Sequence, residues 1–503
     1  MVSTHTLSSP SPDNILDDIE KQFCLDSDSL FKLTKAFLGE IAEGLESYGP
    51  MYVTGVPDGT ETGTFLALDL GGTNLRICEV TLYGDQTLHI RPQQEPVSET
   101  LKTGEATALF DHLANSVQTF LTSSNSHTST SPIYLGLTFS FPVEQTALNS
   151  GVLLTWRKGF VAKGAIGKDV VKLLQDAFDR KQLKVKCVAL VNDTVGTLLS
   201  QAYKTGGCIL GAIFGTGTNG AYIEDITKIT KLANKLPGHE GHMIVNTEWG
   251  AFDNARTTLP STPFDNKLDH ESINLGFQAF EKFISGMYLA LIDAAPKSIL
   301  FSGKTTEKLE AKGGFDTEMM SEIEEGWDMP VDDAAAMKET TTTSPKSIFS
   351  PEWESTLPLP LCTRLTRILQ TLLKLGFKHG EVSLRDAFIV RRVASFVVDR
   401  AAKLSGCAVA ATLVQTGRAC LVGAGVGVGE EGGGVLMLGL MGGTSIFALA
   451  GCLIEKYLNF EGMMRTSLKV LIGEKMGERV KVGMAKDRSG VGALKQVQKQ
   501  PAA

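Results

Sequence analysis

Hydrophobic positions in this chain follow two periods, which predict alternating strands and helices. Apolar runs of strand length occur at 64–70, 75–83, 133–142 and 185–191, and a helical stripe runs from Asp169 to Phe178. A second series of apolar runs begins at Cys208, followed by helical patterns at 277–291 and 385–404. This alternation predicts an α/β fold with one lobe for each series.

Two segments fit neither lobe. The stretch from 340 to 360 is rich in Thr, Ser and Pro and has no period, which predicts a surface insertion or linker. The run from Gly432 to Ile454 carries no charge and reaches the length of a transmembrane helix. Its many glycines argue against a spanning helix, because glycine weakens a helix interior.

Composition narrows the class of protein. With 503 residues, of which 43% are hydrophobic and 21% charged, the chain is long enough for two domains. A net charge of -8 gives no broad basic field, so nucleic acid and membrane surfaces are not expected partners. The 8 cysteines show no metal-ligand spacing, and the first residues do not resemble a signal peptide. We expect a cytoplasmic enzyme that binds a small ligand.

Two glycine-rich turns follow apolar strands, one in each series. The first is the run Asp69-Leu70-Gly71-Gly72-Thr73, in which adjacent N–H groups, a hydroxyl and a carboxylate suit phosphate and hydrated magnesium. Such a sequence is also compatible with an ordinary turn. The second turn, Gly215-Thr216-Gly217-Thr218-Asn219, repeats the pattern. One turn in each lobe is typical of a nucleotide clamped between lobes.

Asp193 stands where the strand at 185–191 ends and a helical pattern begins. An aspartate there is either a helix cap or, if it faces a phosphate, a general base. Other polar residues also follow apolar runs and together suit a polyhydroxylated ligand: Ser140, Lys158, Asn219, Glu248 and Glu281.

Taken in order, these motifs resemble the hexokinase family. The matching segments are LALDLGGTNLR, TFSFP, W-x-KGF, NDTVGT, FGTGTNGAY, NTEWGAFDN and FEKFISGMYL, and they are most similar to the fungal glucokinase branch. The resemblance implies a two-lobed, actin-like ATPase fold with the active site in the cleft between the lobes. It also implies ATP-dependent phosphorylation of glucose at the 6-hydroxyl, the entry step of glycolysis.

The resemblance assigns roles to the matching residues. Asp193 would be the catalytic base, with Lys158 neutralising charge in the reaction. The residues expected to bind glucose are Ser140, Lys158, Asn192, Asp193, Asn219, Glu248 and Glu281. The residues expected to line the two ATP phosphate sites are Asp69, Gly71, Gly72, Thr73, Asn74 and Arg76, and then Gly215, Thr216 and Gly217. Magnesium would arrive with ATP, contacting Asp69 only through water.

The resemblance also implies how the chain divides. Residues 1–63 would form a helical segment on the large lobe, and residues 64–200 the small lobe. Residues 201–480 would form the large lobe, with insertions near 340–360 and 422–452. The segment 481–503 would return to the small lobe.

Two departures from the family leave alternatives open. Arg157 stands where the family has threonine beside Lys158, and Ala450-Gly451-Cys452 replaces an Asp-Gly-Ser that contacts adenosine. The glycine-rich region at 422–452, which includes most of the uncharged run, is interpreted as sequence foreign to the family. A sugar-binding regulator without turnover, or a kinase for another hexose, therefore remains an alternative to a glucose kinase.

Overall fold

The structure is a computed structural model of the chain. It describes residues 12–47, 56–123, 132–156, 159–232, 241–289, 299–311, 313–331, 347–422, 445–450 and 452–484.

Strands and helices alternate over much of this length. The strands are β1 (Thr62–Leu70), β2 (Asn74–Tyr83), β3 (Leu88–Pro96), β4 (Ile133–Phe139), β5 (Val143–Ala147), β6 (Ser150–Leu153), β7 (Val185–Val191), β8 (Leu210–Phe214), β9 (Thr218–Asp225), β10 (His242–Asn246), β11 (Ser445–Ala450) and β12 (Val480–Met484). The helices are α1 (Pro12–Phe23), α2 (Ser27–Ser47), α3 (Glu99–Thr103), α4 (Ala106–Ser123), α5 (Val170–Arg180), α6 (Asp193–Thr205), α7 (Pro263–Glu271), α8 (Ala279–Ile284), α9 (Glu307–Glu310), α10 (Thr317–Asp328), α11 (Leu359–Leu373), α12 (Leu384–Gln415), α13 (Cys452–Lys456), α14 (Phe460–Ile472) and α15 (Glu474–Arg479).

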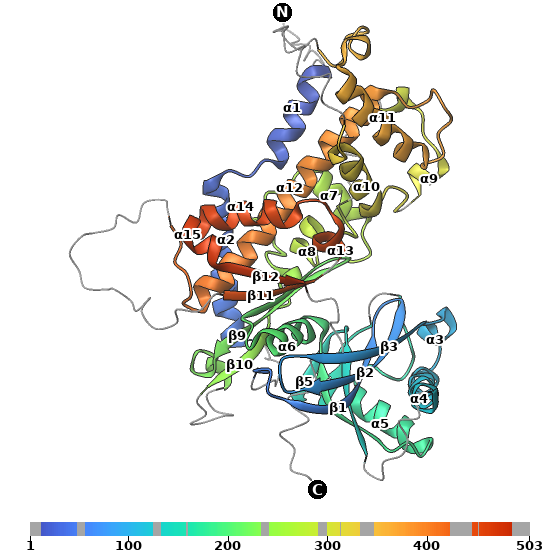
Figure 1. The fold of residues 1–503 in the computed structure, drawn as a ribbon, viewed down its shortest axis with the longest axis vertical. Helices are drawn as coiled ribbons and strands as arrows, with labels where there is room; N and C mark the ends of the chain where they lie inside the picture. The colour runs from blue at the N-terminus through green and yellow to red at the C-terminus, as the bar shows by residue number, and fades with distance from the viewer. Residues whose placement is uncertain are drawn as a thin grey trace, which may run out of the picture.

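The first sheet has the strand order β3-β2-β1-β4-β7 (Figure 1). β1 runs antiparallel to β2, whereas β1, β4 and β7 run parallel to one another. Leu66 and Leu68 of β1 pack in a core with α4 and α5, while Phe65 and Ala67 pack on the opposite face with Tyr203 of α6. Both faces of β1 are therefore buried, which explains its continuous apolar run.

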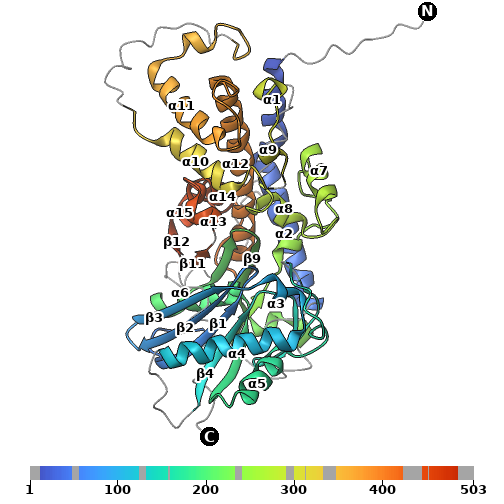
Figure 2. The same cartoon turned by 90° about the vertical axis from the view of Figure 1, so that its right-hand side faces the viewer.

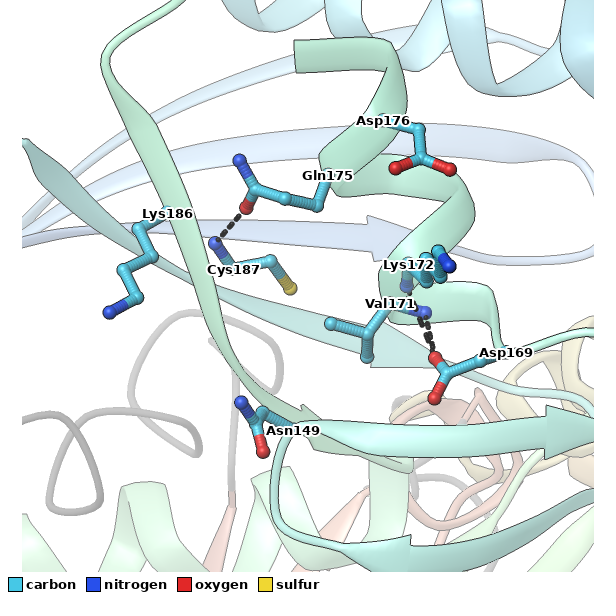
Figure 3. Close-up of a pocket in the computed structure, with 8 residues that line it drawn as sticks. All are labelled: Asn149, Asp169, Val171, Lys172, Gln175, Asp176, Lys186 and Cys187. Atoms are coloured by element: carbon cyan, nitrogen blue, oxygen red, sulfur yellow. Dashed lines mark hydrogen bonds between the residues drawn. The ribbon is translucent and has the colours of Figure 1, made fainter. Parts of the chain in front are cut away.

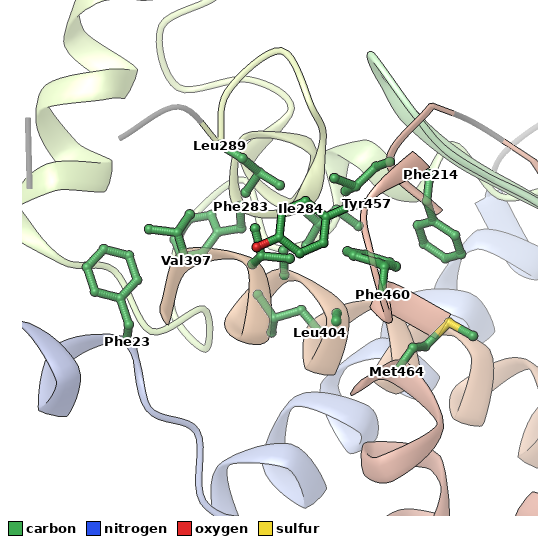
Figure 4. Packing of buried hydrophobic residues seen from close by; sticks show 14 of the residues in the cluster. Phe23, Phe214, Phe283, Ile284, Leu289, Val397, Leu404, Tyr457, Phe460 and Met464 are labelled. Atoms are coloured by element: carbon green, nitrogen blue, oxygen red, sulfur yellow. The ribbon is translucent and has the colours of Figure 1, made fainter. Parts of the chain in front are cut away.

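The second sheet has the order β10-β9-β8-β11-β12, and β8, β11 and β12 are parallel. Leu210, Ala212 and Phe214 of β8 share a core with the long helix α12 and with α14. Figure 4 shows this core around Phe214, where Phe283 of α8 and Phe460 of α14 come from elements far apart in the sequence. The two sheets confirm the predicted α/β class.

Helix α6 lies between the two sheets (Figures 1 and 2). It starts directly after β7 of the first sheet, and its Val195 and Leu198 pack with Ile213 and Ala221 of the second sheet. A methyl group added at Gly211 of β8 would lie 2.6 Å from the Thr194 carbonyl oxygen. Only glycine permits this approach, so the first turn of α6 is held against the second sheet.

Described residues of two unusual segments in the C-terminal half pack in the fold. In the segment expected to be an insertion or linker at 340–360, Trp353 is buried against Phe388 at a ring-centroid distance of 5.4 Å, and the insertion itself stays a prediction. Within the region 422–452, Ser445–Ala450 form β11, which lies between β8 and β12 of the second sheet, so these residues belong to the fold. Residues 423–444 lie outside the described part.

Two further expectations concern the ends of the chain and the membrane. In the expected C-terminal segment 481–503, the four described residues belong to β12 of the second sheet. None of the described helices combines the length and the apolar character that a bilayer crossing requires. The lobe boundaries drawn from the sequence remain a prediction.

Candidate active site

The carboxyl ends of β1, β4 and β7 meet at one edge of the first sheet. Asp69 of β1 pairs with Thr138 of β4, and Thr138 pairs in turn with Val191 of β7. Ser140 follows β4 by one residue and Asp193 follows β7 by two. Ligands of α/β proteins bind at this edge of a parallel sheet, so the register brings together Asp69, Ser140 and Asp193.

The first glycine turn joins β1 to β2. The Gly71 N–H donates to the Asn74 carbonyl over 3.1 Å, and the Thr73 carbonyl accepts the Val97 N–H. Thr73 is exposed, whereas both glycines are half-buried. Arg76 lies two residues into β2, opposite Asp69, and its Nη2 donates to Gln94 Oε1 over 3.2 Å.

Asn192, not Asp193, caps helix α6. Asn192 Oδ1 accepts the Val195 N–H over 2.8 Å, and Asn192 has the extended backbone of an N-cap residue. The cap interpretation of Asp193 is therefore wrong. Asp193 is the first helical residue, is half-buried, and accepts a 3.3 Å hydrogen bond from the Thr194 hydroxyl. Its carboxylate stays available for chemistry at the positive end of the helix dipole.

Glu281 of α8 is tied to the second glycine turn. Glu281 Oε2 accepts the Thr218 N–H over 3.0 Å, and a methyl group at Gly217 would lie 2.7 Å from the same oxygen. The Gly286 N–H, directly beyond α8, donates to the Gly215 carbonyl over 2.7 Å. One carboxylate expected to bind sugar thus lies against a turn expected to bind phosphate.

Asn219, Asn246 and Glu248 form a polar cluster at one end of β9 and β10. Asn219 Nδ2 donates to Asn246 Oδ1 over 2.9 Å and to Glu248 Oε1 over 3.0 Å. Asn246 Nδ2 donates to Glu248 Oε1 over 2.8 Å. Asn246 is absent from the residues predicted from the sequence. The only signal for it was an amide two residues before Glu248, at the end of an apolar strand.

Glu248 has an unusual backbone for this position. Its φ of 50° and ψ of 38° fall in the left-handed region, which costs a non-glycine residue about 1–3 kcal/mol. The Thr247 N–H and hydroxyl both bind the Gly220 carbonyl, and Trp249 Nε1 donates to Thr218 Oγ1 over 2.9 Å. These contacts hold Glu248 from both sides, so its carboxylate is fixed at the strand ends.

Lys158, a predicted site residue, and its neighbour Arg157 lie outside the described residues. The residues on either side of them are well anchored: Trp156 Nε1 donates to the Ala162 carbonyl over 2.8 Å, and its ring stacks on Phe160 with centroids 5.4 Å apart. The roles predicted for Arg157 and Lys158 therefore stay predictions.

The strand end that departs from the family lies beside the second glycine turn. Ala450, the last residue of β11, pairs with Ile213 of β8, two residues before Gly215. Ala450 is fully buried, and Cys452 begins α13. The structure thus puts the Ala450 methyl group at the position where the resemblance implies a carboxylate, close to the predicted phosphate site.

A separate cavity of about 490 Å³ opens on the first lobe between α5 and β7 (Figure 3). None of the predicted site residues lines it. Two of its polar side chains serve the fold: Asp169 Oδ1 caps α5, and Gln175 Oε1 accepts the Cys187 N–H over 3.0 Å. Burial raises the pKa of the Cys187 thiol to about 12, so this thiol is no nucleophile. The cavity adds nothing to the candidate site.

Comparison with known proteins shows which family the chain is similar to. Sequence models described as hexokinase match residues 15–203 and 209–495. The chain is 35% identical to a glucokinase of Aspergillus niger over 94% of each chain, and 34% identical to a hexokinase of Emericella nidulans over 96% of this chain and 90% of that protein. A solved hexokinase from Schistosoma mansoni, complexed with glucose, is similar with a TM-score of 0.75 and 30% identity, covering 98% of this chain and all of that one.

Proposed function

The chain belongs to the hexokinase family, and we propose that it transfers the γ-phosphoryl group of ATP to the 6-hydroxyl of glucose. Members of this family carry out ATP-dependent phosphorylation of a hexose on a two-lobed α/β fold. For this chain the proposal adds that glucose is the sugar, that magnesium accompanies ATP, and that the protein is cytoplasmic. The observation that supports it most is the position of Asp193, which follows the carboxyl end of β7 and is the first residue of the helix that packs against the second sheet.

Asp193 would act as general base. Its carboxylate accepts the proton of the 6-hydroxyl as the sugar oxygen forms a bond to the γ-phosphorus. The bond from that phosphorus to the bridging β,γ-oxygen breaks, and ADP leaves with the electron pair. The N–H groups of the two glycine turns and the Lys158 ammonium would stabilise the negative charge that develops on the phosphoryl oxygens.

Magnesium fits the edge that holds the first glycine turn. Asp69 offers a carboxylate there, and Mg²⁺ prefers oxygen ligands while keeping several of its waters. Bound with ATP, the ion would supply neutralisation of phosphate charge. Asp69 would orient it by accepting hydrogen bonds from its coordinated water molecules.

Glu248, Glu281, Asn219 and Ser140 would recognise the sugar hydroxyls. A site that binds hydroxyls through polar groups rejects analogues that lack them or place them differently. We expect rates of ADP formation to be highest with glucose when glucose, fructose, mannose and N-acetylglucosamine are compared at equal, subsaturating concentration. A higher rate with another sugar would show that this sugar, and not glucose, is the preferred substrate. The assignment as a hexose kinase would stand.

Glucose should close the two lobes. Trp249 is next to Glu248, and Trp156 precedes the segment that contains Lys158, so both indoles should sense closure. We expect a saturable change of tryptophan fluorescence with D-glucose, and a smaller radius of gyration in X-ray scattering. The change should persist in a Trp327→Phe/Trp353→Phe variant, which keeps only the two site indoles. A response to L-glucose of equal size, or no response to D-glucose, would contradict closure around the sugar.

The end of β11, beside the predicted ATP phosphate site, is where the sequence of this chain departs from the pattern that the resemblance implies. We expect Ala450→Asp/Cys452→Ser to lower the KM for ATP about tenfold, because it restores an acceptor and a hydroxyl beside the second turn, the equivalent of one charge-assisted hydrogen bond. The KM for glucose should not change. Because Ala450 is fully buried, thermal unfolding of the double variant is compared with that of the parent to show that β11 stays folded with the new carboxylate.

The same titration separates the kinase from the regulator alternative. An unchanged KM for ATP would show that positions 450 and 452 do not act on the nucleotide. Glucose binding without any ATP binding, in the natural chain alone, would favour a sugar-binding regulator.

A further inference from the structure

Asn246 stands at the centre of the polar cluster at the ends of β9 and β10. Its Oδ1 accepts from Asn219 Nδ2 over 2.9 Å, and its Nδ2 donates to Glu248 Oε1 over 2.8 Å. Asn219 Nδ2 also donates to Glu248 Oε1, over 3.0 Å, so the three side chains form a closed triangle. Asn246 is the only member that uses both its donor and its acceptor on the other two.

Strand register explains why these three residues meet. Asn246, the last residue of β10, pairs with Ala221 of β9, and Asn219 lies two positions before Ala221 on the same face. Beyond Asn246 the chain turns through Glu248, whose left-handed backbone brings its carboxylate back over the strand end. The cluster therefore combines residues of β9, of β10 and of the turn after β10. Asn246 connects Asn219 of β9 with Glu248 of the turn.

The triangle fixes the orientation of both of its other members. Asn219 Oδ1 accepts the Gly220 N–H over 2.8 Å, which directs Asn219 Nδ2 toward Asn246 and Glu248. Both amides donate to the same oxygen of Glu248, Oε1, and so hold the carboxylate in one rotamer. A carboxylate fixed in this way presents Oε2 to a ligand hydroxyl without further ordering.

We propose that Asn246 is a positioning residue for the sugar: it aligns Asn219 and Glu248 so that both meet the sugar hydroxyls in a preformed geometry. This inference rests on the proposed function, because it takes Asn219 and Glu248 as sugar ligands. Asn246 acts through them and need not touch the sugar itself. Its loss should weaken sugar binding while leaving the phosphoryl transfer step and the nucleotide site nearly unchanged.

Two substitutions separate the roles of the Asn246 side chain. Asn246→Asp keeps the acceptor for Asn219 but replaces the donor with a carboxylate oxygen facing Glu248 at hydrogen-bond distance. We expect the KM for glucose to rise at least about tenfold in Asn246→Asp and about five- to tenfold in Asn246→Ala, with the kcat and the KM for ATP within about twofold of the parent. Asn115→Ala, which removes an exposed amide on α4, should change none of these values.

A double-mutant cycle tests whether Asn246 acts through Asn219. If it does, the loss of glucose affinity in the combined Asn219→Ala/Asn246→Ala chain should be clearly smaller than the sum of the two single losses, because only the part of Asn246 that acts through Glu248 is still there to be removed. Fluorescence titration with glucose measures this without turnover, and thermal unfolding shows whether each variant is folded. Fully additive losses, or equal losses in the KM values for glucose and ATP, would overturn the proposal. A parent chain that fails to bind glucose would instead refute the proposed function.

Discussion

Asp193→Asn should lower the kcat at least about 10²-fold while leaving the dissociation constant of glucose within a few-fold. Asparagine keeps the shape of the side chain and removes the proton acceptor. The helix should tolerate the change, because Asn192 supplies the cap hydrogen bond to the Val195 N–H. Steady-state rates together with a fluorescence titration measure both quantities.

Asn192→Ala provides the contrasting variant. Loss of an N-cap costs about 0.5–2 kcal/mol of stability, so this chain should unfold at a lower temperature, whereas Asp193→Asn should not. An Asp193→Asn enzyme with a kcat within a few-fold of the parent would show that Asp193 is not the base. Equal destabilisation by both substitutions would show that the two residues share a structural role.

Arg400→Ala should be the most destabilising single change in the helical part of the second lobe. Arg400 of α12 is fully buried and forms two hydrogen bonds of 2.8 Å and 2.7 Å with Asp265 of α7. Its guanidinium also lies 4.4 Å and 4.7 Å from the ring centroids of Phe23 and Phe283. Removal leaves the Asp265 charge buried without its partner, which costs about 3–5 kcal/mol.

Arg392→Ala is the matched control on the same helix. Arg392 pairs with Glu20 over 2.7 Å, but both side chains are substantially exposed, and such a pair contributes about 0–1 kcal/mol. Urea unfolding, followed by tryptophan fluorescence, should show a large fall in midpoint for Arg400→Ala and a small one for Arg392→Ala. Similar midpoints for the two variants would mean that the Arg400 pair does not hold α7, α8 and α12 together.

The sequence predicts the central strands β1, β4, β7 and β8 well because those strands are buried on both faces, whereas it does not indicate β3, β11 or β12. Phe65 to Leu70 is apolar at almost every position, since α4 and α5 cover one side and α6 the other. Once the parallel strands are known, their carboxyl ends bring Asp69, Ser140 and Asp193 together. This part of the candidate site follows from local pattern and sheet geometry alone.

Helix ends and cross-strand partners are less accessible to such reasoning. The helix expected at 385–404 continues to Gln415 because its last turns are buried on every side, which removes the amphipathic period. Among the described residues of the helical pattern expected at 277–291, the helix covers Ala279–Ile284. It starts there because Gln278 has a positive φ of 56°, and it ends where Ser285 has an extended backbone. Asn246 could not be predicted as a site residue, because its contacts depend on the register between β9 and β10, and the sequence alone does not determine that register.

The most direct test of the proposed function is the stoichiometry of products formed by the 503-residue chain with ATP, magnesium and glucose. We predict one glucose 6-phosphate for each ADP released, no ADP without sugar, and loss of both products in Asp193→Asn. ADP release that does not depend on glucose, or a phosphorylated sugar carrying its phosphate at a position other than the 6-hydroxyl, would contradict it.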